Sequence, residues 1–248
     1  MSSYKRFLYL IIGILFLSAC KSGIMQAGSG QYIAMDKGPE KEKIEKRISP
    51  YRGELELRMK EVVGYAPRPL MKGKPNAALG NYISDLLMRY VRRNLEIDSV
   101  DAALFNNGGF RIALPGDSIR VETIYELMPF ENELVLVTLP YDSLLSMQKY
   151  LLRTGGEAVS KEIKLNAVQG QITDFEINGV KAEKTRNYIL LTSDYLAEGG
   201  DNMFFFRGMK RVNTGKKIRD AIIEAMRIEF MEAKYVEAQA DDRIRIEK

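Results

Sequence analysis

Three short segments of the 248-residue sequence hold the side chains best suited to binding a small molecule. These segments are Asn106-Asn107-Gly108-Gly109-Phe110-Arg111, Pro129-Phe130-Glu131-Asn132 and the run from Thr192 to Asp201, which includes Tyr195, Gly199 and Gly200. Together they supply two aromatic rings, amides, a guanidinium and a carboxylate, on turns where glycine lets another molecule approach the backbone closely. This combination of groups favours a nucleoside or a nucleotide as the ligand.

The first segment follows residues 100–105, which are predicted to form a buried strand, and ligand-contacting groups are common where strands end. Gly108 and Gly109 permit positive φ and expose backbone amides, while the guanidinium of Arg111 is suited to paired contacts with phosphate oxygens. A glycine turn followed by an ordinary surface arginine is the alternative, and this segment alone leaves it open.

The other two segments offer the aromatic faces and the carboxylate. Phe130 and Tyr195 are candidate stacking surfaces, and an aromatic side chain stacked on a base contributes about 1–3 kcal/mol in single-stranded nucleic acids. Asp201 follows Tyr195 on one glycine loop, and an ionised carboxylate can accept hydrogen bonds from both adjacent hydroxyls of a ribose. A core phenylalanine and a carboxylate that caps its own turn are the alternatives.

The composition is that of an ordinary globular protein. With 46% apolar and 28% charged residues, the chain is long enough for one generous domain or two small ones. The formal net charge of +4 is too small to favour binding to a nucleic-acid polymer. The sequence contains no histidine, the usual ligand of a transition-metal hydrolytic centre, so we expect no metal cofactor in this chain.

Residues 1–19 have the pattern of a secretory signal peptide that is removed after export. Lys5 and Arg6 precede an apolar run, residues 7–17, which is shorter than the roughly 20 residues that a membrane-spanning helix needs. The run leads into Leu17-Ser18-Ala19-Cys20, which resembles the bacterial lipobox, where the cysteine is acylated and becomes the new N-terminus. A buried structural cysteine or an uncleaved anchor is the alternative.

Cys20 is the only cysteine in the sequence, so the exported domain is expected to contain no disulfide bond. An acylated Cys20 would attach the protein to a membrane of the bacterial cell envelope, facing the periplasm or the exterior, because each buried lipid methylene contributes about 0.8 kcal/mol. Residues 20–35 are mostly small and polar and are predicted to form a flexible tether, and residues 36–248 are predicted to form the globular domain.

The periodicity of apolar residues predicts a domain in which helices and strands are interleaved without a strict repeat. Helices are predicted over residues 79–94, 121–127 and 214–235, around Leu144 to Leu152, and from residue 40 to about residue 59 with an interruption at Pro50. Strands are predicted over residues 100–105, 133–139, 163–168, 172–177, 187–193 and 203–206, with Asn178-Gly179 as a hairpin turn. The pattern is typical of an α+β fold, a mixed sheet with flanking helices.

Four motifs together resemble the 5′-nucleotidase C-terminal domain family in their order and approximate spacing. They are Leu79-Gly80-Asn81 with Asp85, the turn Asn107-Gly108-Gly109-Phe110-Arg111, the segment Pro129-Phe130-Glu131-Asn132, and Ala197-Glu198-Gly199-Gly200-Asp201. The resemblance extends from about residue 48 to about residue 228. It implies the fold of that domain, in which the base of a nucleotide is clamped between two aromatic rings.

The resemblance assigns roles to the two aromatic residues and to the carboxylate. It places Phe130 and Tyr195 on the two clamping rings, with tyrosine at a position where phenylalanine is commoner. Asp201 falls on the carboxylate that binds the ribose, and Gly200 precedes it in the same glycine turn.

The resemblance also assigns polar contacts, with two departures from the family pattern. Asn106 falls on the asparagine that contacts the base, Asn132 on an amide near the base, and Arg111 on an arginine directed at the phosphate. Family members often have an arginine and a glutamate where this sequence has Lys74-Pro75-Asn76, and a glycine is usual at the position of Lys161.

In this family the C-terminal domain is joined to a metallophosphoesterase domain that holds two metal ions on Asp, Asn and His side chains and supplies the attacking water. Such a domain would be larger than the whole of this sequence, which has no histidine. The resemblance therefore implies the nucleotide-binding half of a hydrolase of nucleotide catabolism, inactive alone, that works with a separately encoded metallophosphoesterase, where the divalent metal ions would lie. Two alternatives stay open: a lipoprotein that binds nucleotides or nucleosides without catalysis, and a domain that has lost the ligand.

Overall fold

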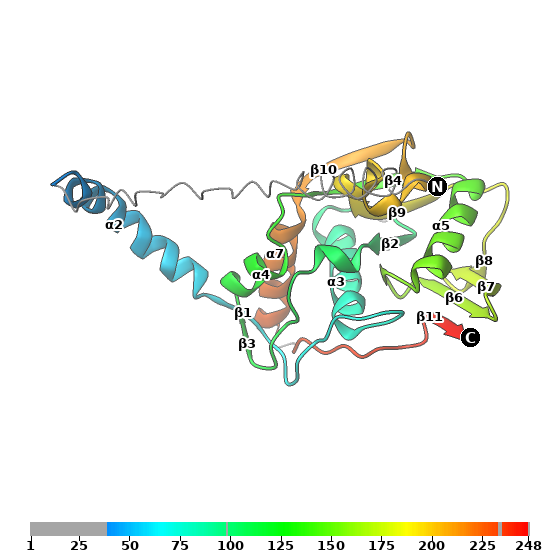
Figure 1. The fold of residues 1–248 in the computed structure, drawn as a ribbon, viewed down its shortest axis with the longest axis horizontal. Helices are drawn as coiled ribbons and strands as arrows, with labels where there is room; N and C mark the ends of the chain where they lie inside the picture. The colour runs from blue at the N-terminus through cyan, green and yellow to red at the C-terminus, as the bar shows by residue number, and fades with distance from the viewer. Residues whose placement is uncertain (1–38, 98, 233–234, 248) are drawn as a thin grey trace, which may run out of the picture. The chain divides into compact units, whose positions relative to one another are not determined.

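The structure, a computed structural model, describes residues 39–97, 99–232 and 235–247 (Figure 1). The predicted signal segment and tether, residues 1–35 with Cys20, lie outside the described residues. None of the described helices is both long enough and apolar enough to cross a membrane.

The first described helix, α2 (Pro39–Met59), ends where the sequence predicts, but it continues through Pro50, where an interruption was predicted. The chain divides into two compact units, and the boundary between Ile48 and Ser49 falls within this helix. Its side chains from residue 42 to residue 58 are exposed. The helix is therefore held by its own backbone hydrogen bonds and by ion pairs on its surface, such as the one between Arg58 and Glu54.

A mixed five-stranded sheet forms the centre of the second unit (Figure 1). Its strands, in spatial order, are β10 (Arg211–Lys217), β4 (Glu133–Leu139), β9 (Tyr188–Ser193), β2 (Ala102–Phe105) and β5 (Ala158–Val159). Strands β2 and β9 are parallel, whereas the other neighbouring pairs are antiparallel. The carboxyl ends of β2 and β9 and the amino end of β4 consequently meet at one edge of the sheet.

Two smaller sheets complete the strands. One is four-stranded, in the order β11 (Ile244–Glu247), β6 (Ile163–Val168), β7 (Gln171–Ile177) and β8 (Val180–Lys181), and the other pairs β1 (Val62–Tyr65) with β3 (Ser118–Arg120). The predicted turn between β7 and β8 is present: Asn178 and Gly179 both have positive φ, at 55° and 75°. Two such residues in succession are what a tight hairpin turn requires.

The helices lie on both faces of the central sheet. They are α3 (Ala78–Asn94), α4 (Val121–Leu127), α5 (Tyr141–Thr154), α6 (Asp194–Ala197) and α7 (Ile218–Met231), with short 3-10 turns η1 (Asn107–Gly109), η2 (Gly200–Asn202) and η3 (Phe204–Phe206). Helices α3 and α7 lie side by side against one face, whereas α5 covers the opposite face together with the four-stranded sheet (Figure 1).

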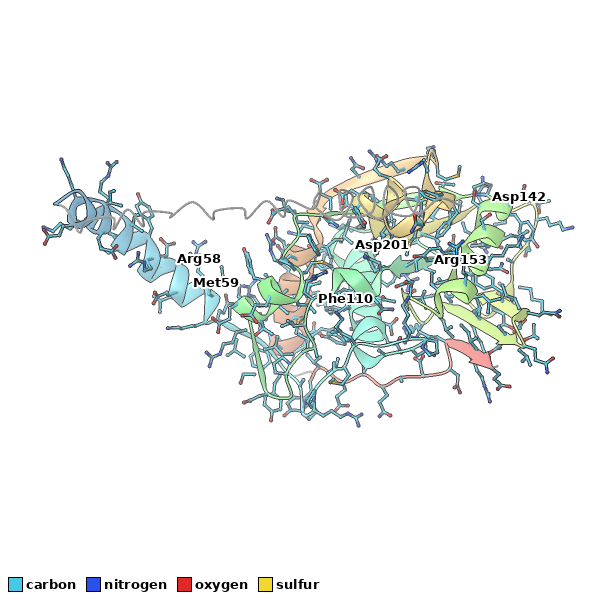
Figure 2. The ribbon with its side chains drawn as sticks, viewed as in Figure 1. Arg58, Met59, Phe110, Asp142, Arg153 and Asp201 are labelled. Carbon is cyan, nitrogen blue, oxygen red and sulfur yellow. The ribbon has the colours of Figure 1, made fainter. Side chains whose placement is uncertain are left out.

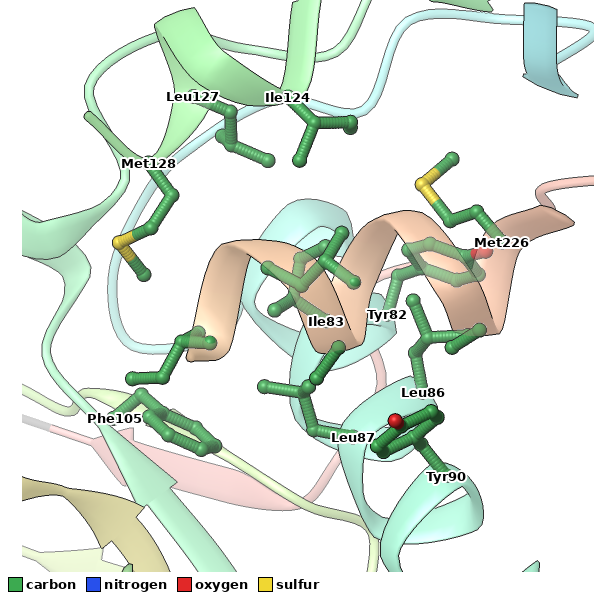
Figure 3. Close-up of a cluster of buried hydrophobic side chains, with 14 of the residues drawn as sticks. Tyr82, Ile83, Leu86, Leu87, Tyr90, Phe105, Ile124, Leu127, Met128 and Met226 are labelled. Atoms are coloured by element: carbon green, nitrogen blue, oxygen red, sulfur yellow. The ribbon is translucent and has the colours of Figure 1, made fainter. Parts of the chain in front are cut away.

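Alternate residues of the central strands enter two separate hydrophobic cores. In β2, Ala103 and Phe105 pack into the core beneath α3, α4 and α7, and Ala102 and Leu104 pack into the core beneath α5. This alternation follows from the pleat of a strand that is buried on both faces. Figure 3 shows the first core, in which Ile83 and Leu87 of α3 cluster with Phe105 of β2 and Met226 of α7. The two cores together hold the central sheet, and with it the edge where the three strands meet.

The structure confirms the predicted α+β class and most of the predicted elements, and it corrects two of them. Residues 203–206 were predicted to form a strand, but η3 occupies this position, because the amides of Phe206 and Arg207 bond to carbonyls three residues back. The helix predicted from residue 214 begins at Ile218 instead. The residues before it form β10, whose Thr214 hydroxyl also donates to the carbonyl of Leu134 on β4, at 2.8 Å.

The charged tail after α7 was not predicted to be structured, and residues 235–247, here called the C-terminal strap, run back across the domain. The amide of Val236 donates to the carbonyl of Tyr65, and β11 at the other end pairs in parallel with β6. In between, the Nδ2 of Asn81 donates to the carbonyl of Gln239 at 3.1 Å, and the Nδ2 of Asn76 donates to that of Asp241 at 2.7 Å. In this structure the Leu-Gly-Asn motif therefore secures the strap.

A buried ion cluster fixes the strap to α3. The guanidinium of Arg243 donates to Asp85 at 2.9 and 3.1 Å, to Asp241 at 2.7 and 2.8 Å, and to the carbonyl of Val159 at 2.8 Å. Burial alone would raise the pKa of Asp241, but the hydrogen bonds from Arg243 hold that pKa below its ordinary value. Asp241 therefore remains ionised, and Lys161 joins the cluster through its backbone amide, which donates to Asp85 at 2.8 Å.

Candidate functional site

A pocket of about 330 Å³ opens at the edge of the central sheet where β2, β9 and β4 meet. Its walls are formed by Phe105, Asn106, Gly108, Gly109, Arg111, Met128, Phe130, Asn132, Ser193, Tyr195, Asp201 and Ile218. Ligand sites in sheet proteins commonly lie beyond the carboxyl ends of strands, as this one does for β2 and β9. The volume is at the lower end of the range for small-molecule sites.

The pocket brings together the three segments that the sequence singles out, although the second and the third lie far apart in the sequence. Every candidate binding residue lines it except Gly200, which lies beneath the ring of Tyr195. A Cβ atom on Gly200 would come within 2.4 Å of that ring, so only glycine lets the ring lie flat against the backbone here.

Four lining residues were missed by the sequence analysis: Phe105, Met128, Ser193 and Ile218. Three of them are apolar and buried in the core, so their types carry no sign of a ligand. Phe105 and Ser193 each end a strand next to a candidate residue, and this position is the one signal that could have identified them. The three apolar side chains supply surface on which a flat ring could rest.

Phe130 and Tyr195 are the two aromatic rings at the mouth of the pocket. Phe130 precedes β4 and Tyr195 follows β9, and the pairing of Leu134 with Ser193 in these antiparallel strands places both rings at the same edge of the sheet. They are 41% and 46% exposed. Both rings therefore offer surface to another molecule.

Asp201, which is labelled in Figure 2, is held by hydrogen bonds from two residues of the pocket wall. The Nδ2 of Asn106 donates to one carboxylate oxygen at 2.6 Å, and the hydroxyl of Tyr195 donates to the other at 2.8 Å. The bond to Asp201 raises the pKa of Tyr195, so the hydroxyl stays protonated at neutral pH. Each carboxylate oxygen keeps a further lone pair, which leaves the group able to accept bonds from a diol.

Arg111 contributes positive charge to the pocket wall. Its Nη1 donates to the carbonyl of Gly108 at 3.3 Å, and its guanidinium carbon lies 5.9 Å from the ring centre of Phe130. Among the described residues, Arg111 forms no salt bridge. Asp201 lines the same pocket and supplies a carboxylate. The pocket thus carries one cation available for an anion and one carboxylate available for hydroxyl groups.

The turn that carries Phe130 is secured to the first turn of α7. The buried guanidinium of Arg219 donates to the carbonyls of Met128 and Phe130 at 3.4 Å and lies 4.1 Å from the ring centre of Tyr125. Arg219 and Lys217 also form ion pairs with Glu131, and their hydrogen bonds lower the pKa of Glu131 to about 2. These contacts fix the backbone that carries the Phe130 side chain.

The glycine turn at the end of β2 is secured from beneath. The buried carboxylate of Glu157 accepts a bond from the amide of Asn107 at 2.8 Å and forms an ion pair with Lys74, also at 2.8 Å. Lys74 stands where family members often have an arginine, and in this structure its ammonium group is used to neutralise Glu157. It does not line the pocket.

The described residues contain no cluster of three or more His, Cys, Asp or Glu side chains able to hold a metal ion. The donor set around the pocket, amides with one carboxylate and one guanidinium, is suited to hydrogen bonding with an organic ligand.

Comparison with solved structures identifies proteins that have a similar fold. The chain is similar to a 5′-nucleotidase precursor of Thermus thermophilus, with 23% identity and a TM-score of 0.67, and to the NAD nucleotidase of Haemophilus influenzae, with 18% identity and a TM-score of 0.64. The alignments cover 82% and 83% of this chain but 43% and 41% of those chains, so this chain spans less than half of their length. No curated protein matches the chain in sequence.

The match to a family model is more specific than the similarity of fold. Residues 62–208, more than half of the sequence, match the family described as 5′-nucleotidase, C-terminal domain. The matched range contains β2, β4 and β9 and all the candidate binding residues, and it ends before α7 and the C-terminal strap. The chain therefore belongs to the 5′-nucleotidase C-terminal domain family.

Proposed function

We propose that this protein is the nucleotide-binding half of a 5′-nucleotidase and presents a nucleoside phosphate to a separately encoded metallophosphoesterase at the cell envelope. The observation that carries the proposal is the convergence of two exposed rings, a carboxylate and an available guanidinium around one pocket. Family membership supports the nucleotide as the ligand class. The partner and its metal ions are inferred from the sequence resemblance alone.

Each part of a nucleoside monophosphate has a matching group in the pocket. The base stacks between the rings of Phe130 and Tyr195, and the two ribose hydroxyls donate to Asp201. The phosphate approaches Arg111 and avoids the like charge of Asp201, which orients the ligand. The amides of Asn106 and Asn132 remain for the edge of the base. Binding of this kind positions the phosphate ester for attack, which is the contribution that this chain makes to hydrolysis.

Phosphate release from AMP tests the partnership. The purified protein is mixed with a candidate secreted metallophosphoesterase, and we expect the rate to rise by about tenfold or more over the partner alone, because positioning a substrate lowers the barrier by several kcal/mol. The Phe130→Ala variant is the matched control, since it should fold normally and give little of the increase. A rate equal to that of the partner alone would count against the catalytic role.

The second candidate function is a lipoprotein that captures nucleotides or nucleosides without catalysis. The observation that favours it is that the pocket is complete within this chain, with rings, carboxylate and guanidinium all present. Calorimetric titration with AMP, adenosine and a UDP-sugar separates the two candidates from a domain that has lost its ligand. Binding without any effect on a partner's rate supports capture alone, and a flat titration supports loss of the ligand.

Attachment to the membrane is a further part of the proposal. Acylated Cys20 anchors the protein, and the segment that follows separates the domain from the membrane surface. The Cys20→Ser variant should therefore move from the membrane fraction to the soluble fraction of fractionated cells. Equal membrane association of the variant and the original protein would contradict the lipid anchor.

A further inference from the structure

The backbone of Asp201 adopts a conformation that a non-glycine residue rarely takes. Its φ is 50° and its ψ is 28°, in the left-handed region, and Asn202 follows with a φ of 63°. This region is unfavourable for residues with a Cβ atom, least so for Asp and Asn, and it persists only where the surroundings hold it. Both residues belong to η2, the turn that carries the carboxylate into the pocket.

Two tyrosine hydroxyls bond to the two peptide units that flank the Cα atom of Asp201. The hydroxyl of Tyr195 accepts a bond from the amide of Asp201 at 3.3 Å, in addition to its bond to the carboxylate. The hydroxyl of Tyr150 donates to the carbonyl of Asp201 at 3.0 Å. Tyr195 lines the pocket, whereas Tyr150 belongs to α5 and does not.

Tyr150 is itself rigidly placed. It is 6% exposed, its ring packs edge-on against Phe205 with ring centres 5.5 Å apart, and the guanidinium of Arg153 lies 5.5 Å from its ring centre. Burial, reinforced by the nearby carboxylates of Glu157 and Asp201, raises the pKa of Tyr150 to about 12. The hydroxyl therefore remains a donor throughout the physiological pH range.

We propose that Tyr150 is a positioning residue that aims the carboxylate of Asp201 at the vicinal hydroxyls of the ligand. A bond to the carbonyl of Asp201 fixes the peptide plane between Asp201 and Asn202, and this plane sets the direction in which the Asp201 side chain leaves the backbone. Tyr150 of α5 thereby acts on the Asp201 side chain through the backbone of that residue. The inference rests on the proposed nucleotide-binding function.

The Tyr150→Phe variant tests this role, because it removes one hydroxyl and keeps the buried ring. Affinities for AMP and for 2′,3′-dideoxy-AMP are measured by titration calorimetry. We expect the variant to bind AMP about fivefold more weakly, the size of one ordinary hydrogen bond, and to bind the dideoxy ligand as tightly as the original protein does. A merely structural defect would weaken both ligands alike.

The matched control is Tyr90→Phe, which removes another buried hydroxyl, bonded to Glu224 at 2.6 Å on the α3–α7 face and outside the pocket. It should leave both affinities unchanged. If the original protein prefers AMP over the dideoxy ligand and Tyr150→Phe keeps the full preference, the positioning role is wrong while the proposed function stands. If the original protein binds neither ligand, the proposed function fails and the role fails with it.

Discussion

Replacing Phe130 with alanine should weaken the binding of AMP by about tenfold. A stacked aromatic ring contributes about 1–3 kcal/mol per base, and 1.4 kcal/mol corresponds to a factor of ten in affinity. The backbone at Phe130 is held by Arg219, which also pairs with Glu131. Ordering the Phe130 side chain on binding therefore costs little free energy. Titration calorimetry with AMP measures the change directly.

The matched control for this experiment is Phe230→Ala. Phe230 is 40% exposed, almost the same as Phe130, but it belongs to α7 and lies outside the pocket. Its removal should leave the affinity for AMP within about twofold, because surface substitutions away from a site have small effects. A similar loss in both variants, or no loss in Phe130→Ala, would show that Phe130 does not stack on the base.

Replacing Arg243 with methionine should lower the free energy of unfolding by about 3 kcal/mol. Removing one partner of a buried ion cluster leaves the remaining charges without compensation, at a cost of roughly 3–5 kcal/mol. We expect the lower end of that range, because Asp241 is partly exposed and can be rehydrated, while Asp85 is nearly buried. Urea unfolding followed by circular dichroism gives the value.

Arg245→Met provides the comparison on the same strap. Arg245 is exposed and forms an ion pair only with the exposed Glu247 among the described residues, and such pairs contribute between zero and about 1 kcal/mol. The two variants remove the same type of side chain from neighbouring positions of the strap, so the difference between them isolates the buried cluster. Equal stability of the two variants would mean that Arg243 does not secure the strap.

The helices and strands with clear apolar patterns could be predicted well from the sequence. The predicted bounds of α4 and β4 coincide with the observed ones, and α3 begins one residue earlier than predicted. Helices of this kind bury one apolar stripe and central strands bury both faces. The residues that pack in the core are therefore the same ones that the apolar periodicity identifies. The order of the strands could not be predicted, because the pairing of β2 with β9 joins segments that are distant in the sequence.

Elements stabilised mainly by backbone pairing were missed. Strand β10 is an exposed edge strand with a polar sequence, so its residues show no apolar alternation and the sequence predicts the start of a helix there. No element was predicted in the C-terminal strap, because its stability comes from amide and ion-pair contacts with Asn76, Asn81 and Asp85, none of which lies near it in the sequence.

Most of the candidate binding residues line one pocket. Their polar and aromatic types lie on turns, where they stand out from the apolar pattern of the core. The residues that hold these turns could not be predicted, since Tyr150, Glu157 and Arg219 act through contacts that only the folded chain creates. The sequences around these three residues are those of an ordinary helix or loop.

The crystal structure of the protein with AMP tests the central claim most directly. We expect adenine stacked between Phe130 and Tyr195, with the ribose hydroxyls bonded to Asp201 and the phosphate beside Arg111. AMP bound at another surface, or in this pocket with its base away from the two rings, would contradict this claim.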